Sequence, residues 1–247
     1  MSYKEIKSPK SFAEDGWDTI IDNVKIGNIS VYEKNLKENT NNTKKINLTG
    51  FGEKTVRIAN TSTPEECKGE VFSQTACGFV VEFVDIITEQ AINSTNDVTN
   101  WENSEIREYM NNDILNSFPE SIRENILTTY TVSGHEFGVN ENYKTYDKLY
   151  LLSTKEVWGK EGIDNIITED SAEAETRQLD YYKEIGVTTE NFDGTIKYNL
   201  NNNSIYWWLR SQDSTVNNFF FVVYDDGDWQ VDSVDNAENG VALAFRL

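Results

Sequence analysis

The chain has 247 residues and a formal net charge of −20, because 42 Asp and Glu residues outnumber 22 Lys and Arg residues. An electrostatic field of this sign repels phosphate backbones, which argues against nucleic acid as a partner. Aromatic residues make up 12% of the sequence, and this bulk is enough for a sizeable core, so the composition also argues against a disordered chain.

Two further features bear on where the protein acts. The sequence has no run of 18 apolar residues, so we expect no membrane insertion, and its N-terminus has no apolar signal region. Display outside a cell would then depend on a virion, on another export route, or on a leader absent from this chain. Cys67 and Cys77 leave the compartment open, because a disulfide worth about 2–3 kcal/mol and two buried thiols explain them equally well.

The first expected elements are a helix and two strands. Asp15 can cap a helix that ends before Gly27, with an apolar stripe formed by Trp17, Ile20, Ile21 and Val24. Residues 33–45 are polar and are typical of an exposed loop. Strands are expected over residues 55–59 and 78–88, and the second is apolar on both faces, which predicts a central strand.

A helical region is expected next. Asn103 can cap a helix with one apolar face, made by Ile106, Tyr109, Met110, Ile114 and Phe118. Pro119 ends this helix and suits the first position of the next one. Residues 147–152 then predict a short strand.

That strand leads into a capping box, in which Ser153 and Glu156 satisfy each other's backbone donors. A further helix is expected over residues 171–185, with Asp170 as its cap and Gly186 as its stop. Residues 187–204 are rich in Asn and predict a loop.

The C-terminal segment is the most informative part of the sequence. Apolar blocks at residues 205–211 and 240–247 bracket a polar segment, 212–239, that holds seven acids and no Lys or Arg. Within it, residues 219–224 and 229–234 predict two strands joined by a tight turn. A chain that stops on its own strand is expected to pair that strand inside the fold. Polar positions between apolar anchors favour a binding surface over a catalytic centre.

Eight blocks of the sequence carry a family resemblance. They are SFAEDGWDTIIDNVKIGN, TVRIANTSTPEEC, SQTACGFVVEF, WENSEIREYMNNDILNSFP, DKLYLLSTKEVWG, RQLDYY, YWWLRS and GVALAFRL. In this order, from Ser11 onward, they resemble domain of unknown function 6273, a family of gut Firmicutes and their phages. The family name itself carries no function.

The ending WLRS…GV…AFR is similar to that of C-type-lectin-fold proteins, including the variable proteins of diversity-generating retroelements and the formylglycine-generating enzymes. The resemblance implies an α+β fold with mixed or antiparallel sheets and flanking helices. Its terminal strands would pair, and an irregular insert would display the ligand-binding residues. Retroelement mutation of template adenines scatters Asn codons into Asp, Ser, Tyr and similar residues, and residues 212–239 have that composition. Leu243, where many relatives have proline, departs from the pattern, as do Gln212 and Glu238, which a mutated Asn codon cannot give.

The candidate ligand-contact residues combine rigid aromatic rings with short polar side chains, as antibody binding surfaces do. They are Gln212, Asp213, Ser214, Tyr224, Asp226, Trp229, Gln230, Asp232, Asp235 and Asn236. The alternative is an ordinary solvated hairpin. Four residues precede the polar segment: Trp207, Trp208, Leu209 and Arg210. We favour packing in the core for them over a role as the floor of the binding surface. Arg210 is expected to form hydrogen bonds to loop carbonyls.

Metal binding and catalysis are poorly supported. Asp225, Asp226 and Asp228 offer the oxygen ligands that Ca²⁺ takes, but a tight turn alone rarely supplies six of them. His135 is the only histidine and lies in no nucleophile motif, and Cys67 lies in an acidic stretch that disfavours a thiolate. We therefore expect no cofactor, no metal and no enzymatic activity.

These features predict an N-terminal extension, residues 1–10, followed by a single C-type-lectin-like domain over residues 11–247. The expected function is non-enzymatic binding of a protein or glycan on a cell surface, with diversification by a retroelement as one version. Two alternatives remain. One is a fixed-specificity adhesion or structural module of a surface or phage assembly, and the other is an enzyme with an unrecognised acidic site.

Overall fold

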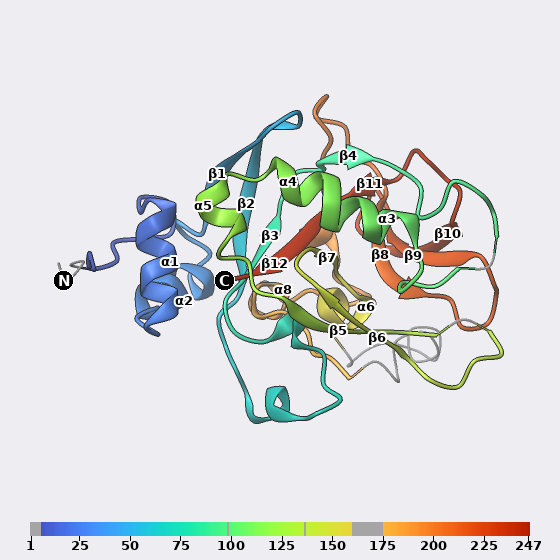
Figure 1. The fold of residues 1–247 in the computed structure, drawn as a ribbon, viewed down its shortest axis with the longest axis horizontal. Helices are drawn as coiled ribbons and strands as arrows, with labels where there is room; N and C mark the ends of the chain where they lie inside the picture. Colours follow the sequence, from blue (N-terminus) through green and yellow to red (C-terminus); the bar gives the residue numbers. More distant parts are fainter. Residues whose placement is uncertain (1–5, 98, 136, 160–174) are drawn as a thin grey trace.

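The computed structural model describes residues 6–97, 99–135, 137–159 and 175–247. In this part of the chain the architecture is α+β, with two five-stranded sheets, one two-stranded sheet and short helices around them (Figure 1). The expected α+β class with antiparallel and mixed sheets is therefore confirmed at this level.

The first sheet is antiparallel and contains the end of the chain. Its strand order is β1-β2-β3-β12-β7, formed by Thr43–Leu48, Gly52–Asn60, Val80–Phe83, Leu243–Arg246 and Tyr150–Leu151. Strand β12 lies between β3 and β7, so the expected pairing of the C-terminal strand inside the fold is confirmed. All four residues of β3 are buried and β3 lies inside the sheet, as expected for a central strand. The single strand expected over residues 78–88 is wrong in its length, because β3 ends at Phe83 and Thr88 belongs to a strand of the second sheet. The expected pairing of the two terminal strands is wrong, because β2 and β3 separate β1 from β12.

The second sheet is mixed and contains the predicted hairpin. Its order is β10-β9-β8-β11-β4, formed by Trp229–Ser233, Phe219–Val223, Trp207–Gln212, Gly240–Val241 and Thr88–Glu89. Strands β9 and β10 pair antiparallel, as expected, and only β8 and β11 pair in parallel. One residue, Ala242, separates β11 from β12, so the last residues of the chain join the two large sheets.

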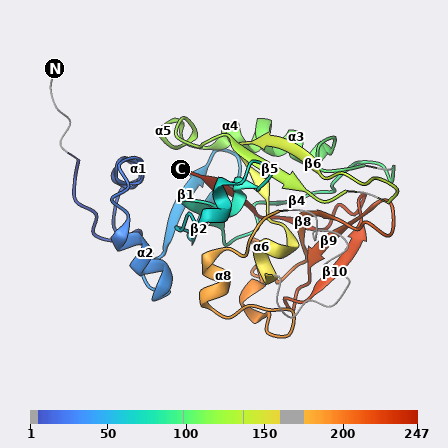
Figure 2. The same ribbon diagram turned by 90° about the horizontal axis from the view of Figure 1, so that it is seen from below.

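The N-terminal helices lie at one end of the molecule, opposite β9 and β10 (Figures 1 and 2). Helix α1 spans Trp17–Lys25 and α2 spans Ser30–Lys37. Gly16, not Asp15, occupies the N-cap of α1, because the Asp15 carboxylate accepts hydrogen bonds from Lys10 N and Tyr32 Oη instead. The exposed loop expected over residues 33–45 is wrong: Leu36 is buried one turn after Tyr32, and this pair anchors α2 in the core.

A second helical run covers one side of the sheets. Helix α3 (Glu105–Tyr109), a π-helical turn η3 (Met110–Ile114) and α4 (Leu115–Ser117) follow one another without a break, and α5 spans Glu120–Arg123. The predicted apolar face is confirmed, since four of its five members are buried and Tyr109 packs partly buried against the same core. Ser104 takes the cap position expected for Asn103, and Pro119 lies just before α5 rather than in its first turn.

The remaining elements are short. Strands β5 (Thr129–Ser133) and β6 (Tyr143–Asp147) form the two-stranded sheet. Helix α6 spans Thr154–Trp158 and has the predicted capping box. Helix α8 spans Asp180–Glu184. The helix expected over 171–185 is therefore wrong over residues 175–179, which are not helical, and its Asp170 cap lies outside the described residues. Among the described residues, three 3₁₀ turns complete the fold: Glu65–Lys68, Gln74–Ala76 and η4, Asp193–Thr195.

One contiguous hydrophobic cluster runs through both large sheets, from Phe12 to Leu247. It encloses two buried charge networks. In one, Arg210 donates to both carboxylate oxygens of Glu156, at 2.6 and 2.7 Å, and both side chains are 0% exposed. In the other, Glu82 pairs with Arg57 at 2.7 Å and with Lys197 at 3.2 Å. Partnered buried charges of this kind are costly to separate.

Cys67 and Cys77 form a disulfide, with their Cα atoms 6.0 Å apart. The bond closes a short loop that holds Phe72 in a small satellite cluster with the two sulfurs. We expect a Cys67→Ser/Cys77→Ser variant to lose about 2–3 kcal/mol of unfolding free energy, since a cross-link limits the freedom of the unfolded chain. Urea unfolding of both proteins, with and without reductant, measures this. If reductant shifts the urea midpoint of the wild type no more than that of the variant, the disulfide does not stabilise the fold as expected.

Candidate ligand-binding site

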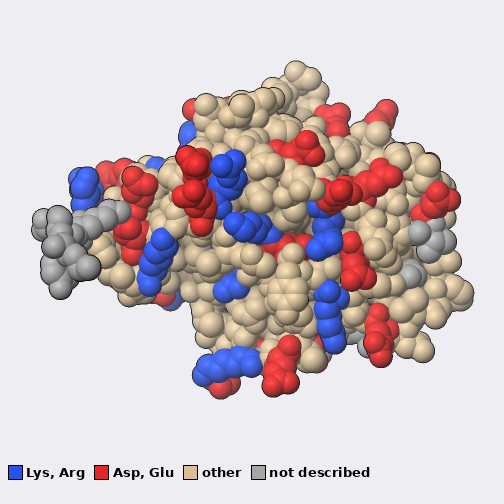
Figure 3. Space-filling view, in the orientation of Figure 1, with Lys and Arg blue, Asp and Glu red and all other residues tan. Residues whose placement is uncertain are grey.

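The predicted contact residues gather around the β9–β10 hairpin, at the end of the molecule opposite α1 and α2 (Figures 1 and 2). We call nine of them the hairpin surface: Asp213, Ser214, Tyr224, Asp226, Trp229, Gln230, Asp232, Asp235 and Asn236. Each of the nine is exposed or half-buried. Acidic side chains stand over this end of the molecule (Figure 3), in keeping with the absence of Lys and Arg from residues 212–239.

The tenth predicted residue, Gln212, lies beneath the surface. Its side chain is 0% exposed, and its Nε2 donates a 2.7 Å hydrogen bond to Thr99 O. Gln212 ends strand β8, whose six residues are all buried between neighbouring elements. Asn239 is also buried. The segment between the apolar blocks therefore contributes polar side chains to the interior as well as to the surface, contrary to the expected division.

Strand β10 is the edge of its sheet, and its outward amides are capped by side chains. The N–H groups of Trp229, Val231 and Ser233 point away from β9, because Val234 N pairs back to Asn218 O and fixes the alternation. Each N–H donates a hydrogen bond to a side-chain oxygen of the preceding residue: Asp228, Gln230 and Asp232 accept at 2.8, 3.1 and 2.7 Å. An edge strand with free amides is a template for pairing with another chain, so these caps protect it.

We expect a triple alanine variant at Asp228, Gln230 and Asp232 to self-associate, because it frees three outward amides on an edge strand. Size-exclusion chromatography with light scattering over a range of protein concentrations measures this. The matched control is Asp225→Ala/Asp235→Ala, which removes two carboxylates from the same hairpin and none of the caps. A triple variant that keeps the wild-type mass at every concentration would show that the caps do not guard the edge.

Aromatic contacts fix the shape of the hairpin. The Tyr224 ring stacks on Tyr206 with centroids 4.2 Å apart, and Trp229 lies tilted against the buried ring of Phe221 at 6.0 Å. The turn between the strands is equally constrained. Gly227 has φ +95°, and a Cβ there would lie 2.4 Å from Phe192 O, so only glycine fits against the loop that carries η4.

Asp232 also organises the loop that follows β10. Its Oδ2 accepts hydrogen bonds from Asn236 Nδ2 at 2.7 Å and from the buried Asn239 Nδ2 at 2.8 Å. Asp213 has a similar local role, since its Oδ1 accepts from both the backbone and the hydroxyl of Thr215. Asp226 does the same in the turn, since its Oδ1 accepts from Asp228 N at 3.1 Å. Several members of the hairpin surface thus also hold the backbone in place.

The residues that precede the hairpin belong to the core, as expected. Trp207, Trp208 and Leu209 are fully buried. Arg210 donates to Leu151 O and Val132 O. The prediction of bonds to carbonyls is confirmed, but these carbonyls belong to strands β7 and β5 and not to loops. Its main partner, Glu156, was not anticipated from the sequence, because nothing in the capping box of α6 indicates that its glutamate also faces an arginine 54 residues away.

Within the described residues, no group of three or more His, Cys, Asp and Glu side chains could hold a metal ion. The three acids of the hairpin turn do not form such a group. Cys67 is held in the disulfide and therefore offers no thiolate as a nucleophile.

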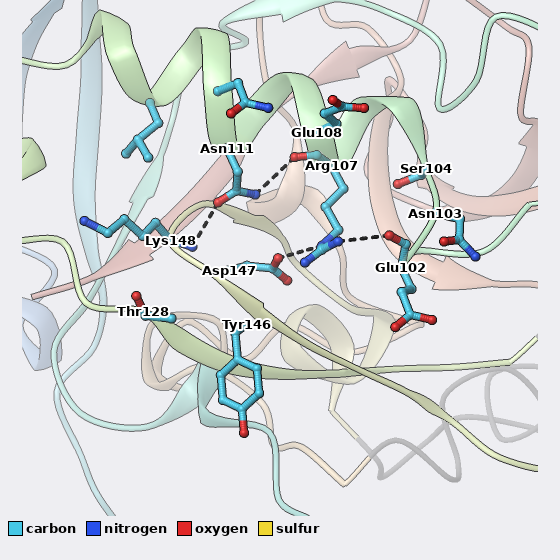
Figure 4. Close-up of a pocket in the computed structure, with 12 residues that line it drawn as sticks. Glu102, Asn103, Ser104, Arg107, Glu108, Asn111, Thr128, Tyr146, Asp147 and Lys148 are labelled. Atoms are coloured by element: carbon cyan, nitrogen blue, oxygen red, sulfur yellow. Dashed lines mark hydrogen bonds and ion pairs between the residues drawn. The ribbon is translucent and has the colours of Figure 1, made fainter.

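A polar hollow that sequence analysis missed lies beside α3 (Figure 4). It has a volume of about 580 Å³ and is lined by residues of the helical run and by the end of β6, among them Glu102, Arg107, Glu108, Tyr146 and Asp147. Arg107 reaches from α3 toward the end of β6, where its Nε lies 2.6 Å from Asp147 Oδ1. Helix and strand are some 40 residues apart along the chain, so no local sequence pattern could have brought them together.

The comparisons with known proteins give a family and nothing beyond it. A family model described as "Domain of unknown function (DUF6273)" matches residues 81–247, about two thirds of the chain. Neither the curated proteins nor the solved structures include a match. Among the described helices, none has the length and apolar character needed to cross a membrane.

Proposed function

Given that the chain belongs to the family described as domain of unknown function 6273, whose description assigns no activity, we propose that it is a non-enzymatic ligand-binding protein. In this proposal the hairpin surface is presented to a protein or glycan on a cell surface, outside the cell or on a phage virion. The fold would be of the C-type-lectin type, with the two large sheets as a rigid base. Gut bacteria and their phages would be its source.

The single observation that carries the proposal is the half-exposed edge strand β10. All five of its residues are partly exposed, including Trp229, although a tryptophan at a sheet edge gains little by remaining in water. The strand is attached to β9, whose last four residues are buried. A rigid apolar strand thus holds an aromatic and polar strand at the surface, which is how a binding surface keeps its shape at low entropic cost.

Diversification by a retroelement is one version of this function. It requires positions that change without unfolding the core, and the exposed Asp226 and Asp235 fit that requirement better than Trp229, which packs against Phe221. The bonds of Asp232 to Asn236 and Asn239 favour the second version, a fixed-specificity adhesion or structural module, because substitution there would loosen the loop. Sequencing around the gene separates the two. A reverse transcriptase beside a near-copy of the segment encoding residues 205–247, differing only at adenines, would establish diversification.

Binding itself is tested with the full chain on arrays of bacterial and host cell surfaces and glycans. A triple variant, Asp226→Ala/Trp229→Ala/Asp235→Ala, should lose binding and keep its melting temperature within a few degrees. The matched control removes two acids and one large apolar side chain from the opposite end of the molecule: Asp18→Ala/Ile26→Ala/Glu38→Ala. Equal binding by the two variants would rule out the hairpin surface as the site.

A further inference from the structure

We propose that the polar hollow beside α3 binds a saccharide. This site is separate from the hairpin surface, and the inference does not depend on the function proposed for that surface. It rests on three features: a rigid floor, a rim with hydrogen-bonding groups of both kinds, and one exposed aromatic ring.

The floor is held by buried hydrogen bonds. Asp147 is 1% exposed and accepts from Arg107 Nε, Trp101 Nε1 and Thr145 Oγ1, at 2.6, 3.2 and 2.7 Å. Asn111 uses its whole amide: Nδ2 donates to the carbonyls of residues 107 and 149, and Oδ1 accepts from the backbone N–H groups of residues 148 and 149. A floor so fixed needs no ordering when a ligand binds, which lowers the entropic cost of binding.

Arg107 offers the ligand a donor. Its Nε is bound to Asp147, and its Nη1 donates to Glu102 O at 2.9 Å. Nη2 has no hydrogen-bond partner among the described residues, and a quarter of the side chain remains exposed. The guanidinium is thus held in one orientation with an unused N–H edge toward the hollow (Figure 4).

Carboxylates also line the hollow: that of Glu102 lies on the same side of α3 as the Arg107 guanidinium, whereas that of Glu108 points away from it (Figure 4). The carboxylates of Glu102 and Glu108 are exposed, and neither takes part in a hydrogen bond or ion pair with the described residues. With Lys148 also in the lining, the charges of the hollow nearly balance, so neither a strongly anionic nor a strongly cationic ligand is favoured. A hydroxyl group donates to a carboxylate and accepts from a guanidinium at once, so a polyhydroxylated neutral ligand matches this rim.

Tyr146 supplies an apolar face. Its side chain is 69% exposed and leans on Tyr130, with ring centroids 5.5 Å apart. An aromatic ring that stands in water beside polar groups can pack against the C–H face of a sugar ring, while its hydroxyl stays hydrated. A saccharide is the ligand class that presents hydroxyl groups and an apolar C–H face together.

The test follows the Arg107 Nε–H resonance of the nitrogen-15-labelled full chain during titration with maltotetraose, cellotetraose and chitotetraose. At least one oligosaccharide should shift this resonance saturably. The variants Tyr146→Ala and Glu102→Ala should each weaken that binding by about tenfold, whereas Tyr198→Ala, which removes an exposed tyrosine outside the hollow, should leave it unchanged. The variant Asp226→Ala/Trp229→Ala/Asp235→Ala should also bind the oligosaccharide as the wild type does. This result distinguishes saccharide binding in the hollow from ligand binding at the hairpin surface.

Three outcomes would overturn the proposal. The first is that none of the three oligosaccharides shifts resonances of residues lining the hollow. The second is that both hollow variants bind as tightly as the Tyr198 control, which would place the sugar elsewhere. The third is that a short peptide with one lysine and one glutamate saturates the site and the sugars do not, which would make the hollow a peptide site.

Discussion

Shortened to residues 81–247, the segment that matches the family model, the chain should fail to form a cooperatively folded monomer. The reason lies in the first sheet, where β3 is hydrogen-bonded on one side to β2. The shortened chain lacks β1 and β2, so β3 becomes an open edge. Val81 and Phe83, which are fully buried, lose their neighbours Ile58 and Val56 across the ladder.

The magnitudes support this expectation. Exposure of a buried apolar side chain costs about 1.5–3 kcal/mol, and Glu82 would lose Arg57, a change that costs about 3–5 kcal/mol for a buried pair. Together these losses are comparable with the entire stability of a typical domain, about 5–15 kcal/mol. Circular dichroism in the near ultraviolet and a thermal melt measure the outcome.

The full chain, melted under the same conditions, is the control. Residues 81–247 giving a sharp melt and a native near-ultraviolet spectrum would show that the segment is self-sufficient. In that case residues 6–80 would be an addition to the fold and not a part of its core.

Replacing Glu156 by glutamine should destabilise the protein by about 3–5 kcal/mol, because it leaves the fully buried Arg210 without a counter-charge. Glutamine still has a side-chain oxygen that can accept from Ser153 N, so the variant keeps the capping interaction and isolates the effect of charge. Denaturant unfolding measures the difference. Glu38→Gln removes the partner of Lys34 in an exposed pair and should leave the unfolding midpoint almost unchanged.

The dependence of stability on pH gives an independent readout. Burial alone would raise the pKa of Glu156, but the charge of Arg210, together with hydrogen bonds from Arg210, Thr75 and the Ser153 backbone, lowers the pKa below its usual 4.5. A carboxylate with a lowered pKa stabilises the fold fully at neutral pH and loses that contribution as the pH falls below the usual value. Stability of the wild type should therefore fall more steeply below about pH 4.5 than that of Glu156→Gln. Parallel curves would contradict the assignment.

Several elements could be predicted because their signals are local. The capping box at Ser153 and Glu156 is a four-residue pattern, and the tight turn at Gly227 predicts the β9–β10 hairpin. The apolar residues of β3 and β12 predict buried strands wherever those strands pair. In each case the residues that decide the structure lie within one turn or one strand of each other.

The candidate site was predictable only in part. The sequence locates the polar segment and its edge hairpin. It predicts both Gln212 and Asp235 as ligand contacts, although Gln212 is fully buried and Asp235 is exposed. Which polar side chain faces outward depends on what the neighbouring strands and loops cover. For Gln212 the cover includes Thr99, a residue of a distant loop.

The sequence by itself determined the composition of the core, the end of the chain on a paired strand and the acidic hairpin, because periodicity and turn chemistry act over a few residues. Tertiary structure alone decided the partner of each buried charge, the position of β12 between β3 and β7, and the hollow between α3 and β6. Those features join residues tens of positions apart, and their geometry is set by how sheets and helices pack. No interaction between neighbours along the chain encodes it.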